Sequence, residues 1–300
     1  MNIDDYNFKD RLIKGITTDG NFKISVVKTT KVVKTARDNH HLSLLNTVVL
    51  GKALTATMLL ASELKGEERI QLRMDGSGPI GSLVAEANSV GEIRGYVQNP
   101  AAELDYSNPE TQLGDGLGLG VLTFSKILYN EAEPRTSSIE LIKGDVNTDV
   151  AHFLAQSEQI PSALLIDVGI DETGKVTQAG GLMIQRLPGA PDGQIDMLQE
   201  RLSSFPAIDE MLSGGHYIDE IMTKAVSPLK VKELTRQPVD FFCRCSRKRF
   251  LNALSMLNYD DLKDMEGEGQ EVVCQYCNKT EVISKDEVEK IIMDAQAKLN

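Results

Sequence analysis

Cys243-Arg-Cys245 and Cys274-Gln-Tyr-Cys277 hold all four cysteines of this 300-residue chain, and residues 246–273 separate the two pairs. Two such pairs, brought together by a loop, supply four thiolates, the ligand set of a closed tetrahedral Zn²⁺ site. The same close pairs can also be oxidised to two local disulfides. The sequence therefore predicts that Cys243, Cys245, Cys274 and Cys277 bind one Zn²⁺ per chain. A static zinc site, a thiol switch and another metal cluster such as iron–sulfur remain open.

The size of the cysteine-bearing segment favours a metal-dependent fold. From about Val239 to Asn300 it has roughly 60 residues, and a core that small rarely contributes more than ~3–5 kcal/mol. A structural zinc contributes on the order of 10–16 kcal/mol in small peptides. We therefore expect residues 239–300 to form a small C-terminal zinc-binding domain that unfolds when the metal leaves.

Basic residues surround the first cysteine pair at Arg244, Arg247, Lys248 and Arg249. Such cations favour thiolate over thiol and would increase sensitivity to oxidants. They would equally offset the net negative charge of a zinc centre with four thiolates. The sequence does not decide between these two accounts.

Composition limits the classes of partner. The net charge of −12 argues against sequence-independent nucleic-acid binding, which depends on neutralising phosphates. The start of the chain has no secretory signal pattern, and the apolar stretch from Leu44 to Ala61 is expected to be too polar and short to span a membrane. We therefore expect a cytoplasmic protein without nucleic-acid or membrane partners, in which clustered cysteines serve metal or redox chemistry.

The pattern of apolar residues predicts an α+β fold in which a large mixed N-terminal domain, residues 1–190, carries a mainly antiparallel sheet. Asp19-Gly20 indicates a hairpin between two of its strands. The expected strands are Arg11–Thr17, Phe22–Val33, Ile70–Met74, Gly81–Ala87, Glu92–Val97, Leu119–Phe124, Ser138–Ile142, Ala163–Gly169 and Thr177–Arg186. The expected helices are an amphipathic one over His41–Leu64 and a second over Asp145–Gln156.

Residues 191–238 are expected to form a helical, metastable linker. Short apolar patterns around Ile195, Ile208 and Ile218 are broken by proline and glycine. Helices this short depend on docking for their stability. A charged stretch between Pro228 and Pro238 is expected to lead into the cysteine-bearing domain.

No arrangement of residues predicts a catalytic centre, so we expect a protein that is not an enzyme. Gly114-Asp-Gly-Leu-Gly-Leu-Gly120 lacks the Gly-Lys-Ser/Thr of a phosphate loop and the spacing of a dinucleotide fingerprint. Glycine at every second position instead indicates a place where another backbone approaches closely. The four histidines show no metal-ligand spacing, and no catalytic residues are assigned.

The chain resembles the family of the bacterial redox-regulated 33 kDa chaperonin (heat-shock protein 33). The likeness lies in both cysteine pairs, in the gap between them and in several ordered segments. These segments are Met74-Asp-Gly-Ser-Gly-Pro79, Gly91-Glu-Ile-Arg-Gly-Tyr-Val-Gln-Asn-Pro100, Gln156-Ser-Glu-Gln159 and Ala179-Gly-Gly-Leu-Met-Ile-Gln185. The family often has an aromatic residue soon after the second pair, where this chain has Thr280-Glu-Val-Ile283.

This resemblance implies a cytosolic, ATP-independent holdase that binds unfolding client proteins under oxidative stress and heat. The reduced, zinc-bound form would be inactive. Oxidation would form the disulfides Cys243–Cys245 and Cys274–Cys277, release the zinc and unfold the linker, and the active form would be a homodimer. The alternatives are a static zinc-stabilised interaction module and a thiol–disulfide oxidoreductase using Cys274-Gln-Tyr-Cys277, although no thioredoxin-like βαβ context precedes that motif.

Overall fold

The protein divides into two compact units, Met1–Phe242 and Cys243–Asn300. The computed structural model describes residues 9–129, 131, 133–191 and 193–299. The larger unit includes the stretch expected to be a linker as well as residues 239–242. The metastability of the linker over residues 191–238 stays a prediction.

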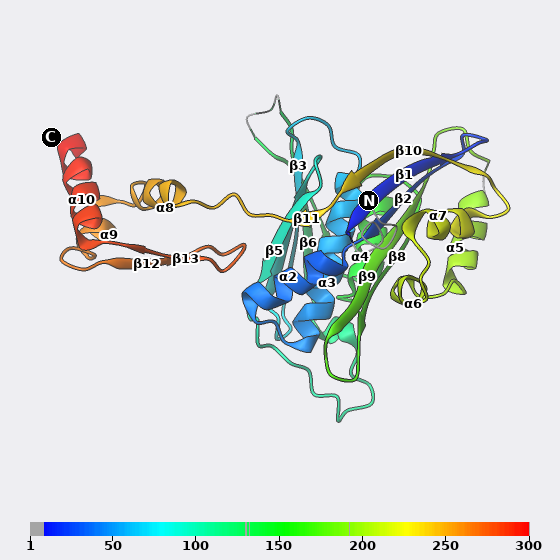
Figure 1. Ribbon diagram of the computed structural model, residues 1–300, viewed down its shortest axis with the longest axis horizontal. Coiled ribbons are helices and arrows are strands. Elements are labelled where there is room, and N and C mark those ends of the chain that lie inside the picture. The colour runs from blue at the N-terminus through cyan, green and yellow to red at the C-terminus, as the bar shows by residue number, and fades with distance from the viewer. Residues whose placement is uncertain (1–8, 130, 132, 192, 300) are drawn as a thin grey trace. The chain divides into compact units, whose positions relative to one another are not determined.

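The larger unit contains two sheets, which confirms the α+β class with mainly antiparallel pairing (Figure 1). Among the described residues, the strand pairs of this unit are antiparallel except that between β11 and β5. The five-stranded sheet runs β10 (Val231–Pro238), β1 (Arg11–Thr17), β2 (Phe22–Lys28), β9 (Val176–Arg186) and β8 (Ser162–Ile170). The six-stranded sheet runs β11 (Asp240–Phe241), β5 (Glu92–Val97), β4 (Ser82–Asn88), β3 (Arg69–Gly76), β6 (Gly120–Ile127) and β7 (Arg135–Glu140).

Helix α3 (Leu44–Ala61) lies between the two sheets and contacts strands of both (Figure 1). By length and composition this helix could cross a membrane, so the expectation that it is too short and polar was wrong. However, 83% of it is buried inside the protein, as in the core helix of a globular domain. The predicted amphipathic pattern was also wrong, because the buried residues include the polar Asn46, Thr47 and Thr55, whereas the apolar Leu44 is exposed. The neighbouring helices are α2 (Thr30–His40) and α4 (Val146–Gln156), and the short helix η1 is Leu113–Gly116.

Three short helices cover the other face of the five-stranded sheet (Figure 1). They are α5 (Gln194–Ser203), α6 (Ile208–Ser213) and α7 (Ile218–Val226). Their buried apolar side chains form one cluster with those of the strands beneath, including Ile24 and Leu182. The charged stretch after Pro228 is not a simple connection, since it forms β10 and pairs with β1. Its alternation is weak because it is an exposed edge strand.

The predicted strand over Phe22–Val33 is too long, because β2 ends at Lys28 and α2 begins at Thr30. The start of α2 is fixed by a distant residue. Asp10 lies before β1, and its Oδ2 accepts a hydrogen bond of 2.9 Å from the backbone N–H of Val32. A carboxylate at this position satisfies an orphan helix donor and complements the helix dipole. No local pattern could indicate this contact.

The buried carboxyl of Asp10 predicts a pH-dependent stability. Burial raises the pKa of Asp10 to about 7, although the Val32 N–H and the charge of Lys28 oppose the shift. The folded state then binds the proton more tightly than the unfolded state, so stability falls as pH rises from about 4 to about 7. The pKa difference corresponds to about 4 kcal/mol at 1.36 kcal/mol per unit.

Asp10→Asn should therefore raise the free energy of unfolding at pH 8 by about 1–3 kcal/mol. This increase in stability is smaller than the about 4 kcal/mol that corresponds to the pKa difference, because the new amide group brings N–H donors that need hydrogen-bond partners. Denaturant unfolding at pH 4.5 and pH 8 measures the effect, with exposed Asp38→Asn as the control. A wild type whose stability does not change between the two pH values would contradict this prediction.

The glycine-rich segment packs against backbone, as its two-residue period predicted. A Cβ added to Gly114 would lie 2.0 Å from the carbonyl oxygen of Lys143. One added to Gly120 would lie 1.9 Å from the carbonyl oxygen of Asp75. These glycines therefore allow close contacts between neighbouring segments, as a structural role requires.

The smaller unit has two short strands and three helices (Figure 1). They are α8 (Arg247–Leu254), α9 (Tyr259–Lys263), β12 (Gln270–Val273), β13 (Thr280–Ile283) and α10 (Lys285–Leu299). Among its described residues, the buried apolar side chains are Leu254, Leu262, Ile283, Val288 and Ile292. A two-stranded hairpin and so small a core are marginal alone, so this unit needs further cross-linking.

Candidate metal centre

The first cysteine pair lies in the extended segment that leads into α8. Alternate residues of an extended segment face the same side, which places Cys243 and Cys245 together. Ser246 then ends this segment as the N-cap of α8, where its side chain accepts a hydrogen bond from the Arg249 N–H. The chain thus begins a helix directly after the second thiol.

The second pair lies on the tight turn between β12 and β13. The Cys274 N–H donates to the carbonyl of Lys279 at 2.9 Å, and the Asn278 N–H donates to the carbonyl of Cys274 at 2.7 Å. Asn278 has a φ of 57°, in the left-handed region that asparagine tolerates better than most residues. The turn therefore holds Cys274 and Cys277 on one hairpin end.

The two pairs meet in a compact cluster of four sulfurs. All four Sγ atoms lie within 4.8 Å of one another. Contacts between the pairs include Cys243 Sγ to Cys274 Sγ at 3.6 Å and Cys245 Sγ to Cys277 Sγ at 3.4 Å. A tetrahedral site with Zn–S bonds of about 2.3 Å requires sulfurs about 3.8 Å apart. These four soft donors therefore fit a tetrahedral metal ion such as Zn²⁺.

The electrostatics of the cluster favour a bound cation. Burial raises the pKa of the Cys277 thiol, and charge on the neighbouring Cys243 adds to the effect. Burial likewise raises the pKa of Cys245. Four adjacent thiolates repel one another unless a cation neutralises them, and metal binding at such a site displaces protons. All four cysteines are partly buried, so solvent does not fully screen this repulsion.

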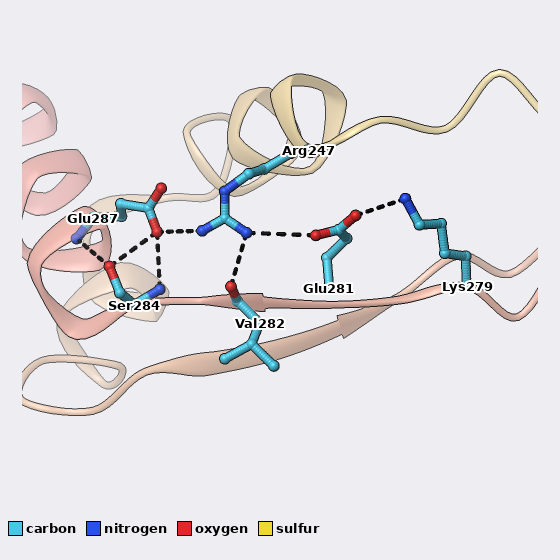
Figure 2. Close-up of polar contacts among 6 residues, drawn as sticks. All are labelled: Arg247, Lys279, Glu281, Val282, Ser284 and Glu287. Carbon is cyan, nitrogen blue, oxygen red and sulfur yellow. Dashed lines mark hydrogen bonds and ion pairs between the residues drawn. The ribbon is translucent and has the colours of Figure 1, made fainter.

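The predicted basic residues do not act as one group. Figure 2 shows that the Arg247 guanidinium points toward Glu281, Glu287 and the carbonyl of Val282, and these contacts account for its charge. Lys279, which the sequence interpretation overlooked, is sensitive to the cluster: its pKa is raised first by Glu281 and further by the charges of Cys245 and Cys277. Its position two residues after Cys277 could have indicated in the sequence that Lys279 lies near the cysteines.

The predicted ligands come together in the smaller unit, and all four histidines belong to the larger unit. His216 pairs with Glu220 on α7, in the larger unit. Within the described part of the chain, these four cysteines are the group of histidine, cysteine or acidic side chains that lie close enough together to hold one metal ion.

Comparisons with known proteins agree with this architecture. The model of the family described as Hsp33 protein matches residues 10–284. The 33 kDa chaperonin of Desulforamulus reducens is 35% identical over 294 residues, covering 97% of this chain and 99% of that protein. That of Streptococcus thermophilus is 36% identical over 288 residues, with 95% and 100% coverage.

A solved structure extends the likeness to the fold. The crystal structure of the 33 kDa chaperonin, a heat shock protein 33 homolog, from Thermotoga maritima matches with a TM-score of 0.88 and 31% identity. The match covers 96% of this chain and 99% of that one. Family model, relatives and structure span both units, and the chain therefore belongs to the Hsp33 family of chaperonins.

Proposed function

We propose that this protein is an ATP-independent holdase that is inactive when reduced and zinc-bound and becomes active on oxidation. One observation carries the proposal: four thiols from two separate segments form a single cluster in a unit whose described core has five buried apolar side chains. The cross-link that stabilises this unit is also the group most readily oxidised. Sensor and structural element would then be the same four residues.

The proposed chemistry belongs to the four cysteines. Zn²⁺ held by Cys243, Cys245, Cys274 and Cys277 would neutralise the thiolates and join the two segments. Peroxide or hypochlorous acid would accept two electrons for each disulfide formed, and peroxide would leave as water. Bonds Cys243–Cys245 and Cys274–Cys277 would each join cysteines of one pair. The four-thiolate site would then be lost, and with it the link between segments.

The helices over the five-stranded sheet would supply the surface for clients. Their docking combines a favourable contact with an unfavourable one. Asp167 Oδ2 accepts a hydrogen bond of 2.8 Å from the Ile208 N–H at the start of α6, whereas the charges of Asp167 and Asp209 repel each other. Burial first, and then the charge of Asp167, raises the pKa of Asp209. This repulsion supports a linker that is only marginally docked. Its release would expose the apolar cluster beneath.

The same redox scheme implies a cellular compartment, an oligomeric state and a class of partner. The protein would act in the cytoplasm as a stress-response chaperone without catalytic turnover, and the oxidised form would be a homodimer. Its partners would be unfolding proteins and neither nucleic acid nor membranes. A static zinc module is the main alternative, and it differs by retaining zinc under mild oxidation.

The expected result is that only the oxidised protein suppresses aggregation of a chemically unfolded client. Light scattering would be followed with the full chain either zinc-loaded and reduced or oxidised with peroxide at elevated temperature. Suppression by neither form would reject the holdase function. Equal suppression by both forms would reject the redox control.

The same oxidised sample tests the disulfide pairing. A protease specific for glutamate cleaves after Glu266, Glu268 and Glu271, between the two cysteine pairs, and neither pair contains an acidic residue. Bonds within pairs would give two separate peptides, each lighter by two hydrogens. Bonds between the pairs would give one linked species, and this result would contradict the proposed disulfides.

A further inference from the structure

A contact network centred on Arg247 joins the segment that follows the first cysteine pair to the strand and helix that follow the second pair (Figure 2). Arg247 Nη1 donates to the Val282 carbonyl at 2.9 Å and lies 3.4 Å from Glu281 Oε2. Its Nη2 donates to Glu287 Oε2 at 2.6 Å. We call Arg247, Glu281, Val282 and Glu287 the Arg247 clamp.

The clamp connects the two segments that carry the cysteine pairs. Arg247 lies two residues after Cys245, at the start of α8. Glu281 and Val282 lie on β13, the strand that leaves the turn of Cys274 and Cys277. The guanidinium therefore spans from the segment of the first pair to the hairpin of the second.

The third arm of the clamp reaches helix α10. Glu287 Oε2, which accepts from Arg247, also accepts hydrogen bonds of 2.9 Å from both the N–H and the Oγ of Ser284 (Figure 2). The Glu287 N–H is 3.4 Å from Ser284 Oγ, which completes a capping box at the start of α10. The Glu287 carboxylate is thus fixed in place before it meets the guanidinium, which reduces the entropy lost in forming the ion pair.

Helix propensity alone does not explain why an arginine occupies position 247, in the first turn of α8. The first turn of α8 contains Arg247, Lys248 and Arg249 and no acidic residue. Positive charge at a helix N-terminus is unfavourable, because the helix dipole places its positive end there. Glu281 and Glu287 supply the missing negative charge from the opposite segment. A local conflict that is resolved by residues of the segment carrying the second cysteine pair indicates a role in holding the two segments together.

We propose that Arg247 is a positioning residue of the metal centre: its clamp holds the two cysteine pairs within reach of one metal ion and so sets how readily that ion is released. Groups that hydrogen-bond to metal ligands typically change metal affinity by 10- to 100-fold when they are replaced. Arg247 acts on the segments that carry the thiols and not on a thiol itself, so we expect an effect at the lower end of that range. The inference deepens the proposed function and rests on its zinc site. Weakening the clamp would lower the oxidant dose that opens the site.

The test is the rate of zinc release from the full-length reduced chain to a coloured chelator, with and without peroxide. Arg247→Gln should release zinc about 10-fold faster than the wild type. Glu287→Gln retains an oxygen for the cap of α10 but loses the charge, and should also accelerate release. In the double variant the two effects should not add, because each substitution removes the same ion pair.

Arg249→Gln is the matched control. It removes the same charge from the same helical turn, and in the described part of the chain Arg249 has no ion pair. Its release rate should stay within about twofold of the wild type, since it is an exposed surface charge. Raising salt from about 0.1 M to 1 M shortens the Debye length from about 10 Å to 3 Å and should speed release from the wild type more than from Arg247→Gln.

The outcomes separate this inference from the proposed function. Equal release from Arg247→Gln and Arg249→Gln would overturn the role of Arg247 and leave the zinc site standing. A wild type that binds no zinc would overturn the proposed function itself. Faster release from Arg247→Gln without any aggregation suppression by the oxidised wild type would support the clamp and reject the holdase.

Discussion

Replacing Cys274 by serine should abolish tight zinc binding and unfold residues 243–300 while Met1–Phe242 stays folded. Serine leaves three thiols in a cluster whose four sulfurs lie within 4.8 Å of one another. Structural zinc contributes on the order of 10–16 kcal/mol in small peptides, whereas a core of this size contributes about 3–5 kcal/mol. The loss of the site therefore exceeds what the remaining core can offset.

The two compact units make this effect local. The core of the smaller unit is formed by Leu254, Leu262, Ile283, Val288 and Ile292, with further partly buried side chains around them, all from that unit. The larger unit has its own apolar clusters. Limited proteolysis of the variant should cut first within residues 243–300, and far-UV circular dichroism should show partial loss of helix.

Val273→Ser provides the control for this substitution. Val273 directly precedes Cys274 on β12, and its side chain is half exposed. The change introduces the same residue one position away from the ligand, and zinc content should remain at one ion per chain. If Cys274→Ser retained zinc and resisted proteolysis like Val273→Ser, the metal-dependent fold would be rejected.

The sequence predicted those features that short-range patterns determine. Strand β5 is Glu92–Val97, the same residues that the alternation predicted. The hairpin at Asp19-Gly20 and the cluster of the four cysteines were also confirmed, since a turn residue and ligand spacing carry that information. The metal itself is not determined by either.

What the sequence did not predict depends on distant partners. The start of α2 is set by Asp10, 22 residues before Val32. The partners of Arg247 lie 34 to 40 residues further along the chain. No periodicity or motif links residues at such separations, because the contacts exist only after the segments have folded together.

The second large effect is expected at Met222 on α7. This side chain is 2% exposed, and its sulfur packs over Gly15 of β1, where an added Cβ would lie 2.9 Å from it. Truncating a buried methionine to alanine costs about 2–5 kcal/mol. Helix α7 has nine residues and is too short to be stable alone, so the loss falls on its docking to the sheet.

Met222→Ala should therefore give partial suppression of client aggregation in the reduced, zinc-loaded form. The undocked helices would expose the apolar cluster that they share with the five-stranded sheet. Light scattering with a chemically unfolded client measures the effect, and a chelator assay confirms that zinc is retained. Thermal unfolding followed by circular dichroism should show an earlier first transition.

Met197→Ala is the matched control, because Met197 lies on the neighbouring helix α5 and is 57% exposed. The same truncation at that site should change neither stability nor activity. Suppression by reduced Met222→Ala with its zinc in place would mean that helix release, rather than metal loss, creates the client surface. A destabilised Met222→Ala that remains inactive would mean that clients bind elsewhere, and that the sheet face beneath α7 serves folding alone.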